Sequence, residues 1–408
     1  MKNLNENILA VFVVFTMIGV IFFSGCTSPV KNSIPSGVNS LPNSSNETIR
    51  IGAVYNLEGS EATFDIPSMQ GAKLAVKEIN EQGGIHGKPL ELIVKDGKSN
   101  TSAVIAGVTE LAESGRVPII IGLSNPDQAL PAAKAAASAK IYFVTSGATS
   151  PRLPDQVPEY LYLACMGDNT QAAVGAEYAA GPLHAENIYI LYESDKQYPT
   201  LLAGYFKTRF LDLNRTVQKI DTFHSTDTNF SSQVANLSTL SPSPDIIFLS
   251  AETWADAKPV IQEIRNAGFT MPVMGGDGYD SPALLTGGAN GVDNVFYTTH
   301  TWFNPLSTNE KQHNFMARYM EEYNSSAVPF AGLGYDTVMV VAEAIRNSDS
   351  PLAFPDGMAN ITFYTGVTGN LSYSGNNHIP VKSVTLMMIQ NGTLVHIGDF
   401  EPVKVPTP

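Results

Sequence analysis

The sequence predicts an α/β protein made of two doubly wound parallel-sheet lobes that are joined by a hinge. Two observations carry this prediction: strands and helices alternate along the chain, and the alternation restarts after Gly167. The expected strands are short and almost continuously apolar, which is typical of parallel sheets covered by helices on both faces. They lie at residues 49–55, 90–95, 117–122 and 141–145 in the first series, and at residues 187–192, 216–221, 245–250 and 273–275 in the second.

Amphipathic helices separate the expected strands. In the first of them, at residues 67–82, Ala72, Ala75, Val76 and Ile79 fall on one face at helical spacing. A chain of 408 residues is long for a single core and suggests about two or three domains, in agreement with two lobes. The other expected helices span residues 101–114, 128–139, 170–180, 199–211, 230–240 and 254–267.

Composition and charge exclude several classes of function. The formal net charge is −14, which argues against nucleic acid or an anionic lipid surface as the main partner, because both attract basic patches. The two cysteines, Cys26 and Cys165, and the scattered histidines form no metal-binding motif, so we expect neither a metal nor a cofactor. Cys165 is expected to be a small buried hydrophobic residue. We expect the protein to be a monomer.

The amino-terminal residues have the pattern of an export signal. Residues 8–23 form an almost unbroken apolar run that is too short for a comfortable membrane span of about 20 residues. Small residues directly before Cys26 are typical of a lipoprotein processing site. We therefore predict a signal and processing site at residues 1–26 and lipidation of Cys26, with an uncut amino-terminal anchor as the alternative.

The segment after Cys26 is predicted to be a flexible stalk. Residues 27–48 are rich in Ser, Pro and Asn and have almost no apolar content. Such a segment buries too little surface to fold. Whether the chain is lipidated or keeps an uncut anchor, the folded part is expected to lie outside the cytoplasm, tethered to the outer face of the cell membrane.

The loops that follow the expected strands hold the residues that can bind a ligand, because ligands of doubly wound sheets lie beyond the carboxyl ends of the strands. The sequence has no GxGxxG after the first strand, no GxxxxGK(S/T) and no GxSxG. The sequence therefore gives no support for a site that binds a dinucleotide or a nucleoside triphosphate, or for a hydrolase nucleophile. No set of nucleophile, base and orienting residue stands out, so we expect a binding protein and not an enzyme. The alternative from another functional class is a secreted α/β enzyme.

Three segments resemble one known family. EINEQGGIHGKPLELIVKD at Glu78–Asp96, SGATSP at Ser146–Pro151 and GGDGY at Gly275–Tyr279 are similar to type 1 periplasmic binding proteins of the Leu/Ile/Val-binding family. The resemblance extends from about Ile49 to Phe400 and implies the type 1 periplasmic binding protein fold, with each lobe threaded from separate segments. The implied segments are residues 49–167 plus 302–368 for lobe 1 and residues 168–301 plus 369–400 for lobe 2.

The resemblance also implies a function and a ligand site. It implies a receptor that delivers a small polar ligand, in the first place an amino acid, to an ABC transporter permease. Gly147 and Thr149 match the loop that holds the α-carboxylate and ammonium of the ligand, and Asp277 matches the acid that pairs with the ammonium. Phe64 matches an aromatic residue that packs on the ligand side chain, and Tyr198 matches one that closes over the ligand from the second lobe.

The sequence departs from the family pattern in the loop after residues 117–122. An ungapped alignment places Pro126 where the family usually offers a Ser for the carboxylate, and Pro126 has no N–H group to donate. Ser124, Asn125 or Gln128 are the expected substitutes. Asp127 and Glu252 add acidic groups near the expected cleft, so a ligand with more positive charge is an alternative.

Other interpretations remain open at this point. Amides, urea-like solutes and polyamines compete with an amino acid as the ligand. A ligand-sensing receptor ectodomain is a further alternative, although the sequence up to Pro408 contains neither a second membrane segment nor an output domain.

Overall fold

The computed structural model describes residues 48–284, 288–289, 292–307, 309–348, 353–373 and 378–408. Cys26, the predicted signal and nearly all of the predicted stalk lie outside the described residues. Within the described ranges, no helix is both long and apolar enough to cross a membrane. Residues 45–408 form one compact unit. Its sheets, helices and core clusters are complete within these residues, so we treat this unit as able to fold without the segment before it.

The first sheet has five parallel strands in the order β2-β1-β3-β4-β5. Alternate residues of a strand point to opposite faces, and both faces are apolar. Ile119 and Ile121 lie in one hydrophobic cluster with α1 and α10, whereas Ile120 lies in another with α2 and α3. The strands are β1 (Ile49–Tyr55), β2 (Leu90–Asp96), β3 (Ile119–Gly122), β4 (Tyr142–Thr145) and β5 (Leu161–Leu163).

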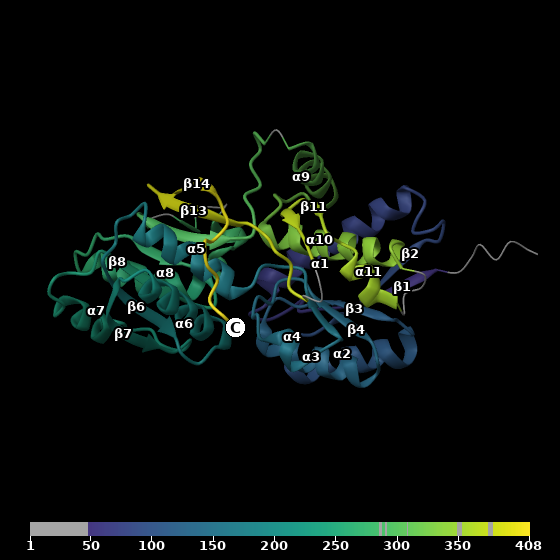
Figure 1. Ribbon diagram of the computed structural model, residues 1–408, viewed down its shortest axis with the longest axis horizontal. Coiled ribbons are helices and arrows are strands. Elements are labelled where there is room, and N and C mark those ends of the chain that lie inside the picture. The colour runs from purple at the N-terminus through teal and green to yellow at the C-terminus, as the bar shows by residue number, and fades with distance from the viewer. Residues whose placement is uncertain (1–47, 285–287, 290–291, 308, 349–352, 374–377) are drawn as a thin grey trace, which may run out of the picture. The chain divides into compact units, whose positions relative to one another are not determined.

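Helices cover both faces of this sheet. Figure 1 shows α2 and α3 on one side, and α1, α10 and α11 on the other. The helix α2 continues into a short π-helix at Leu111–Gly115. The first helix begins earlier than the sequence pattern suggests, so Phe64 lies in its first turn and not in a loop. These elements are α1 (Ala62–Glu81), α2 (Thr101–Glu110), α3 (Pro126–Ser138), α4 (Leu153–Gln156), α10 (Pro329–Arg346) and α11 (Phe354–Ala359).

The second sheet has seven strands in the order β14-β13-β10-β9-β8-β6-β7. Its strands from β6 to β10 are parallel, whereas β13 and β14 form an antiparallel hairpin that pairs with β10. The predicted α/β class with parallel sheets is confirmed, and the hairpin is an addition to it. The strands are β6 (Asn187–Glu193), β7 (Thr216–Phe223), β8 (Ile246–Ser250), β9 (Val273–Gly275), β10 (Val295–Thr299), β13 (Val384–Gln390) and β14 (Thr393–Phe400).

Helices also cover both faces of the second sheet. Buried residues of α5 and α6 form one cluster against it, and residues of α8 form another on the opposite face. The short 3-10 turn Asp277–Tyr279 follows β9 directly. The helices are α5 (Asp168–Ala180), α6 (Gln197–Asp212), α7 (Ser231–Ser238) and α8 (Trp254–Asn266).

The chain returns to the first sheet after β10. Phe315 and Tyr319 of α9 (Glu310–Tyr323) join the core cluster that contains α1 and α10. The hairpin of β11 (Tyr364–Gly366) and β12 (Gly369–Leu371) follows. Tyr373 also belongs to that cluster and donates a hydrogen bond to the Leu163 carbonyl. Residues 369–373 thus pack with the first sheet, and the limits proposed for the two lobes stay a prediction.

Candidate functional site

The loops at the carboxyl ends of the two sheets enclose a small cavity. Its volume is about 20 Å³, which is room for roughly one water molecule. Both halves of the fold contribute, because the lining comes from the loops after β1, β3 and β4, from the loops after β6, β8 and β9, and from the start of α10. The lining residues are Glu61, Phe64, Ser124, Pro126, Gly147, Thr149, Tyr198, Glu252, Asp277, Gly278 and Phe330.

The structure brings the predicted site residues together. Those that line the cavity are Phe64, Ser124, Gly147, Thr149, Tyr198, Glu252 and Asp277. Asn125 does not line it, but its side chain bonds to Glu252. Asp127 is exposed and lies outside the lining, although its charge raises the pKa of both Glu61 and Glu252. Sequence reasoning missed Glu61 and Phe330.

An aromatic wall forms one side of the cavity. The rings of Phe64 and Phe330 have their centroids 4.7 Å apart at an angle of 42°. Phe330 stands in the first turn of α10, which begins with Pro329 as a preorganised first residue. A Cβ atom at Gly147 would lie only 2.8 Å from the Phe330 ring and 2.9 Å from the Ser124 hydroxyl. Glycine at position 147 therefore allows these walls to approach each other.

The N-terminus of α3 is already satisfied by Asn125. The side-chain oxygen of Asn125 accepts the Asp127 N–H at 2.8 Å, and its carbonyl accepts the N–H groups of Gln128 and Ala129. Pro126 has no N–H group. The Gln128 side chain accepts from Asn56 at 2.6 Å. This helix end therefore does not present a ready anion site, in contrast to the helix starts that commonly hold carboxylates.

Two buried carboxyl groups line the cavity. Glu61 is 4% exposed and Glu252 is 7% exposed. Burial raises the pKa of Glu61, and burial followed by repulsion from Glu61 and Glu193 raises the pKa of Glu252 well above its ordinary value. One oxygen of each, Oε2, has no hydrogen-bond partner among the described residues. The Asn125 side chain opposes the rise in the pKa of Glu61, and the Ser124 hydroxyl does the same for the buried Asp65. No Lys or Arg side chain is part of the lining, although the nearby charge of Lys196 partly offsets the rise in the pKa of both acids.

Asp277 is held by three protein donors. Its Oδ1 accepts from the Tyr198 hydroxyl at 2.7 Å and from the Gln171 amide at 2.6 Å. Its Oδ2 lies 2.8 Å from Nε2 of His300. Burial alone would raise the pKa of Asp277, but His300, Gln171 and Tyr198 together hold it below its ordinary value. The carboxylate is therefore ionised, and little of its acceptor capacity remains for a ligand.

His300 and Asp168 complete this polar cluster below the cavity. Burial lowers the pKa of His300, although the hydrogen bond to Asp277 and the charge of Asp277 oppose this. Burial, together with repulsion from Asp277, raises the pKa of Asp168 to about 8, although the Thr149 hydroxyl and the Gln171 amide bond to it. Thr149 is thus tied to Asp168 as well as lining the cavity. Within the described residues, no group of three or more His, Cys, Asp or Glu could hold a metal ion.

Comparisons with known proteins agree with this fold. Residues 48–393 match the family model of the periplasmic binding proteins. The Leu/Ile/Val-binding protein homolog 1 of Brucella abortus is 22% identical over 331 residues, which cover 80% of this chain and 86% of that protein.

Solved structures show the same architecture. The substrate binding protein LivJ of a branched-chain amino acid transporter from Streptococcus pneumoniae, in complex with isoleucine, is 25% identical with a TM-score of 0.78, and the match covers 87% of this chain and 100% of that one. The leucine binding protein LivK of Thermotoga maritima is 24% identical with a TM-score of 0.78, over 87% of this chain and 99% of that one. The family resemblance seen in the sequence is confirmed, and these relatives are solute-binding proteins and not enzymes. The chain belongs to the periplasmic binding protein family.

Proposed function

We propose that this protein is an extracytoplasmic, monomeric receptor that captures a small amine, in the first place an amino acid with a positively charged side chain, and delivers it to an ABC permease. One observation carries the proposal. Glu61 and Glu252 are buried acids that line the same cavity, no Lys or Arg side chain is in its lining, and each acid keeps one oxygen without a partner among the described residues.

The electrostatics of the cavity favour a cation. A buried carboxyl group with a raised pKa is stabilised in its charged form when a cation enters within hydrogen-bond distance. Charge-assisted bonds between an ammonium group and carboxylates are shorter and stronger than neutral ones. The Ser124 hydroxyl, which also lines the cavity, supplies a further acceptor. An ammonium group, which has three donors and no acceptor, matches this set of oxygens.

The aromatic residues suit the apolar part of such a ligand. The Phe64–Phe330 pair lines one side, and Tyr198 lies at the other with its hydroxyl turned to Asp277. Aromatic faces attract cations as well as methylene groups. This wall therefore fits an alkyl chain that ends in an ammonium group. The isoleucine bound by the Streptococcus pneumoniae relative supports an amino acid as the class of ligand.

The two halves of the fold are in direct contact at the cavity. The direct hydrogen bond from Asn125 to Glu252, 2.6 Å long, joins the loop after β3 to the loop after β8. A volume of about 20 Å³ is too small for an amino acid. We infer that the two halves open to admit the ligand and close over it by hinge motion.

Tethering and delivery belong to the same proposal. The apolar run at residues 8–23 and the small residues before Cys26 support export and lipidation of Cys26. A receptor held at the outer face of the membrane stays close to its permease, which raises the effective concentration of the loaded form.

Calorimetric titration of residues 45–408 with four matched compounds tests the proposal. L-norleucine and L-lysine differ by one terminal ammonium group, cadaverine is lysine without its carboxylate, and acetamide represents the neutral amides. We expect L-lysine to bind at least ten times more tightly than L-norleucine. Equal affinities would contradict the preference for a cation, and binding of acetamide alone would favour the amide alternative. Cadaverine that binds as well as lysine would show that the carboxylate is not recognised.

A further inference from the structure

A second, larger cavity lies away from the cleft and has no part in the function proposed above. Its volume is about 440 Å³, within the range of small-molecule sites. Packed protein interiors leave few voids larger than a water molecule. This cavity is partly open to solvent and has room for a small molecule.

The cavity lies where the two halves of the fold meet. On one side it is lined by Phe303, Ala327 and Val328, which belong to the core cluster of the first sheet. On the other side it is lined by Tyr297 and Met387 from the core cluster of the second sheet. Residues 301–303, in the segment that connects β10 to α9, form part of the wall. Any change in the angle between the halves changes the shape of this cavity.

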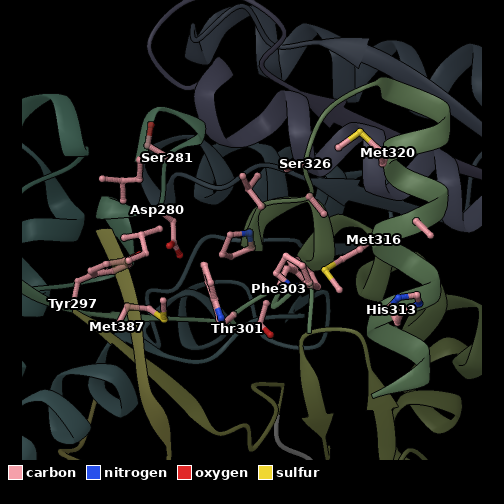
Figure 2. A pocket seen from close by; sticks show the side chains of 18 residues that line it. Asp280, Ser281, Tyr297, Thr301, Phe303, His313, Met316, Met320, Ser326 and Met387 are labelled. Atoms are coloured by element: carbon pink, nitrogen blue, oxygen red, sulfur yellow. The ribbon is translucent and has the colours of Figure 1, made fainter. Parts of the chain in front are cut away.

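The lining is apolar and adaptable. Figure 2 shows Met316 and Met320 of α9 facing Tyr297 and Met387 across the cavity. Methionine side chains are flexible and polarizable, so they adjust to ligands of different shape. No Lys or Arg side chain is among the lining residues. His313 of α9 is the lining side chain that could carry a positive charge.

A few polar groups lie at one edge of this second cavity. Asp280 and Ser281 lie together at the end of the loop that follows β9, and Figure 2 shows both on the side opposite α9. Asp280 is buried, its carboxyl group bonds to the Thr299 hydroxyl, and burial raises its pKa well above the ordinary value. The Asp280 carboxyl group can therefore exchange a hydrogen bond with a polar group of an occupant at this edge.

We propose that this cavity is a second binding site, which takes a small neutral apolar molecule with one hydroxyl group and whose occupation favours the closed cleft. The size selects a small molecule, and the Met and aromatic walls select an apolar one, because an ion loses its hydration among them. An occupant of this site contacts both halves of the fold. It therefore stabilises the relative position that they have here, in which Asn125 and Glu252 are joined.

The fluorescence of Trp302 reports whether the second cavity is occupied. It lines the cavity, whereas the other of the two tryptophans, Trp254, is 4% exposed and packs against Tyr279. We would titrate residues 45–408 with cyclohexanol, cyclohexylammonium and cyclohexanecarboxylate, which share one ring and differ in charge. We expect cyclohexanol to shift the fluorescence emission of Trp302 to shorter wavelength, with a response that saturates. Both ions should bind at least ten times more weakly than cyclohexanol. Trp302→Phe should lose this signal. No saturable response to cyclohexanol, or an equal response to either ion, would overturn the proposal.

A blocking variant and its control locate the site. Ala317 is a position of α9 that lines the cavity and lies outside the core clusters, so Ala317→Phe fills the entrance without disturbing the core. Asn314 is exposed on the same helix and does not line the cavity. We expect Ala317→Phe to weaken cyclohexanol binding at least tenfold and Asn314→Phe to leave it within twofold. Equal effects of the two substitutions would overturn the proposed location. Loss of a dimer in Ala317→Phe, seen by sedimentation, would mean that a second copy fills the cavity and would also overturn it.

The coupling to the cleft rests on the proposed function and has its own test. Thermodynamic linkage requires that each ligand change the affinity of the other by the same factor. We expect saturating cyclohexanol to tighten L-lysine binding about fivefold or more. Unchanged lysine affinity would contradict the coupling. Absence of lysine binding would contradict the proposed ligand of the cleft, and it would leave the Trp302 titration as the measure of the second site.

Discussion

The side-chain amide of Asn125 joins two parts of the fold, because its oxygen caps α3 while its nitrogen donates a 2.6 Å hydrogen bond to Glu252. Asn125 follows β3 of the first sheet, and Glu252 follows β8 of the second. The cap fixes the orientation of the amide, so the donor is already aimed when Glu252 approaches. Closure therefore places Glu252 at the cavity with one oxygen bonded and the other without a partner among the described residues.

Replacement of Glu252 by Gln should separate ligand affinity from stability. Gln keeps the shape of the side chain and loses the charge, so we expect L-lysine to bind about 30-fold more weakly or worse, the lower end of the cost of unpairing a buried charge. Burial and repulsion already raise the pKa of Glu252, so the free energy of unfolding of the ligand-free protein should not fall. Calorimetric titration and urea unfolding measure the two effects.

The exposed Glu401 provides the matched control for this experiment. Glu401→Gln makes the same chemical change at the surface, and lysine affinity should stay within twofold. A Glu252→Gln protein that binds lysine as the parent does would show that this acid does not face the ligand cation.

Replacement of Asp277 by Asn should instead destabilise the protein even without ligand. Tyr198, Gln171 and His300 all donate toward Asp277, and an Asn side chain has one oxygen and places an NH₂ group against a donor. We expect a loss of about 1–3 kcal/mol in the free energy of unfolding, the usual penalty for a buried polar group without a partner. Urea unfolding at pH 7 measures it. Unchanged stability would mean that the carboxylate is free for the ligand.

The stability of the ligand-free protein should fall as the pH rises from about 4 to about 8. Burial raises the pKa of Asp168 to about 8 and that of Asp65 to about 7, whereas both titrate near 3.9 in an unfolded chain. The folded state therefore holds more protons across this range, and the free energy of unfolding decreases with increasing pH. Urea unfolding at pH 5 and pH 8 should show the difference.

The variant Asp168→Asn tests whether Asp168 contributes to the pH dependence of the free energy of unfolding. An amide cannot ionise, so the variant avoids the cost of protonating Asp168 on folding, which begins near pH 4 and grows up to pH 8. Its advantage over the parent should therefore increase by about 3 kcal/mol between pH 5 and pH 8. A parent and a variant with parallel stability curves would exclude Asp168 as the source of the pH dependence.

The location of the site could be predicted from the sequence because parallel strands place their carboxyl ends at one edge. Glu252 and Asp277 follow β8 and β9 directly, and Gly147 and Thr149 follow β4, so strand assignment alone brings them near one another. The same reasoning places Tyr198 after β6. These residues needed no knowledge of the tertiary packing.

Other parts of the site depend on contacts between segments distant in sequence. Phe330 reaches the cavity only because the chain returns to the first sheet after β10, and helical periodicity does not specify where the start of α10 lies. Glu61 could have been noticed as an acid in the loop after β1, but the predicted helix begins five residues or so after the observed boundary at Ala62. The antiparallel hairpin of β13 and β14 was missed because its strands have no intervening helix.

The tether can be tested through Cys26. If the residues before it form a lipoprotein processing site, Cys26→Ser should abolish lipidation and leave the protein in the aqueous phase of a detergent partition experiment, or unprocessed. The wild-type chain should enter the detergent phase with its amino terminus removed at Cys26. Partition of Cys26→Ser into detergent, with an intact terminus in both proteins, would favour an uncut anchor instead.

The packing of α1 against α10 should depend on two glycines. A Cβ atom at Gly334 would lie 1.8 Å from the Ser68 carbonyl oxygen, and one at Gly71 would lie 1.8 Å from that of Ala331. The contacting atoms are backbone, so the helices must move apart to admit a methyl group. We expect Gly334→Ala to lower the free energy of unfolding by about 1–3 kcal/mol, as overpacking typically does.

A glycine in an open part of another helix provides the comparison. A Cβ atom added at Gly204 in α6 would have no atom within 4 Å, so Gly204→Ala should raise the free energy of unfolding by about 0.5–1 kcal/mol. Chemical unfolding measures the free energy of unfolding of Gly334→Ala and Gly204→Ala, which make the same substitution in two different helices. Equal changes would mean that helix propensity, and not the close approach of α1 and α10, determines the effect at Gly334.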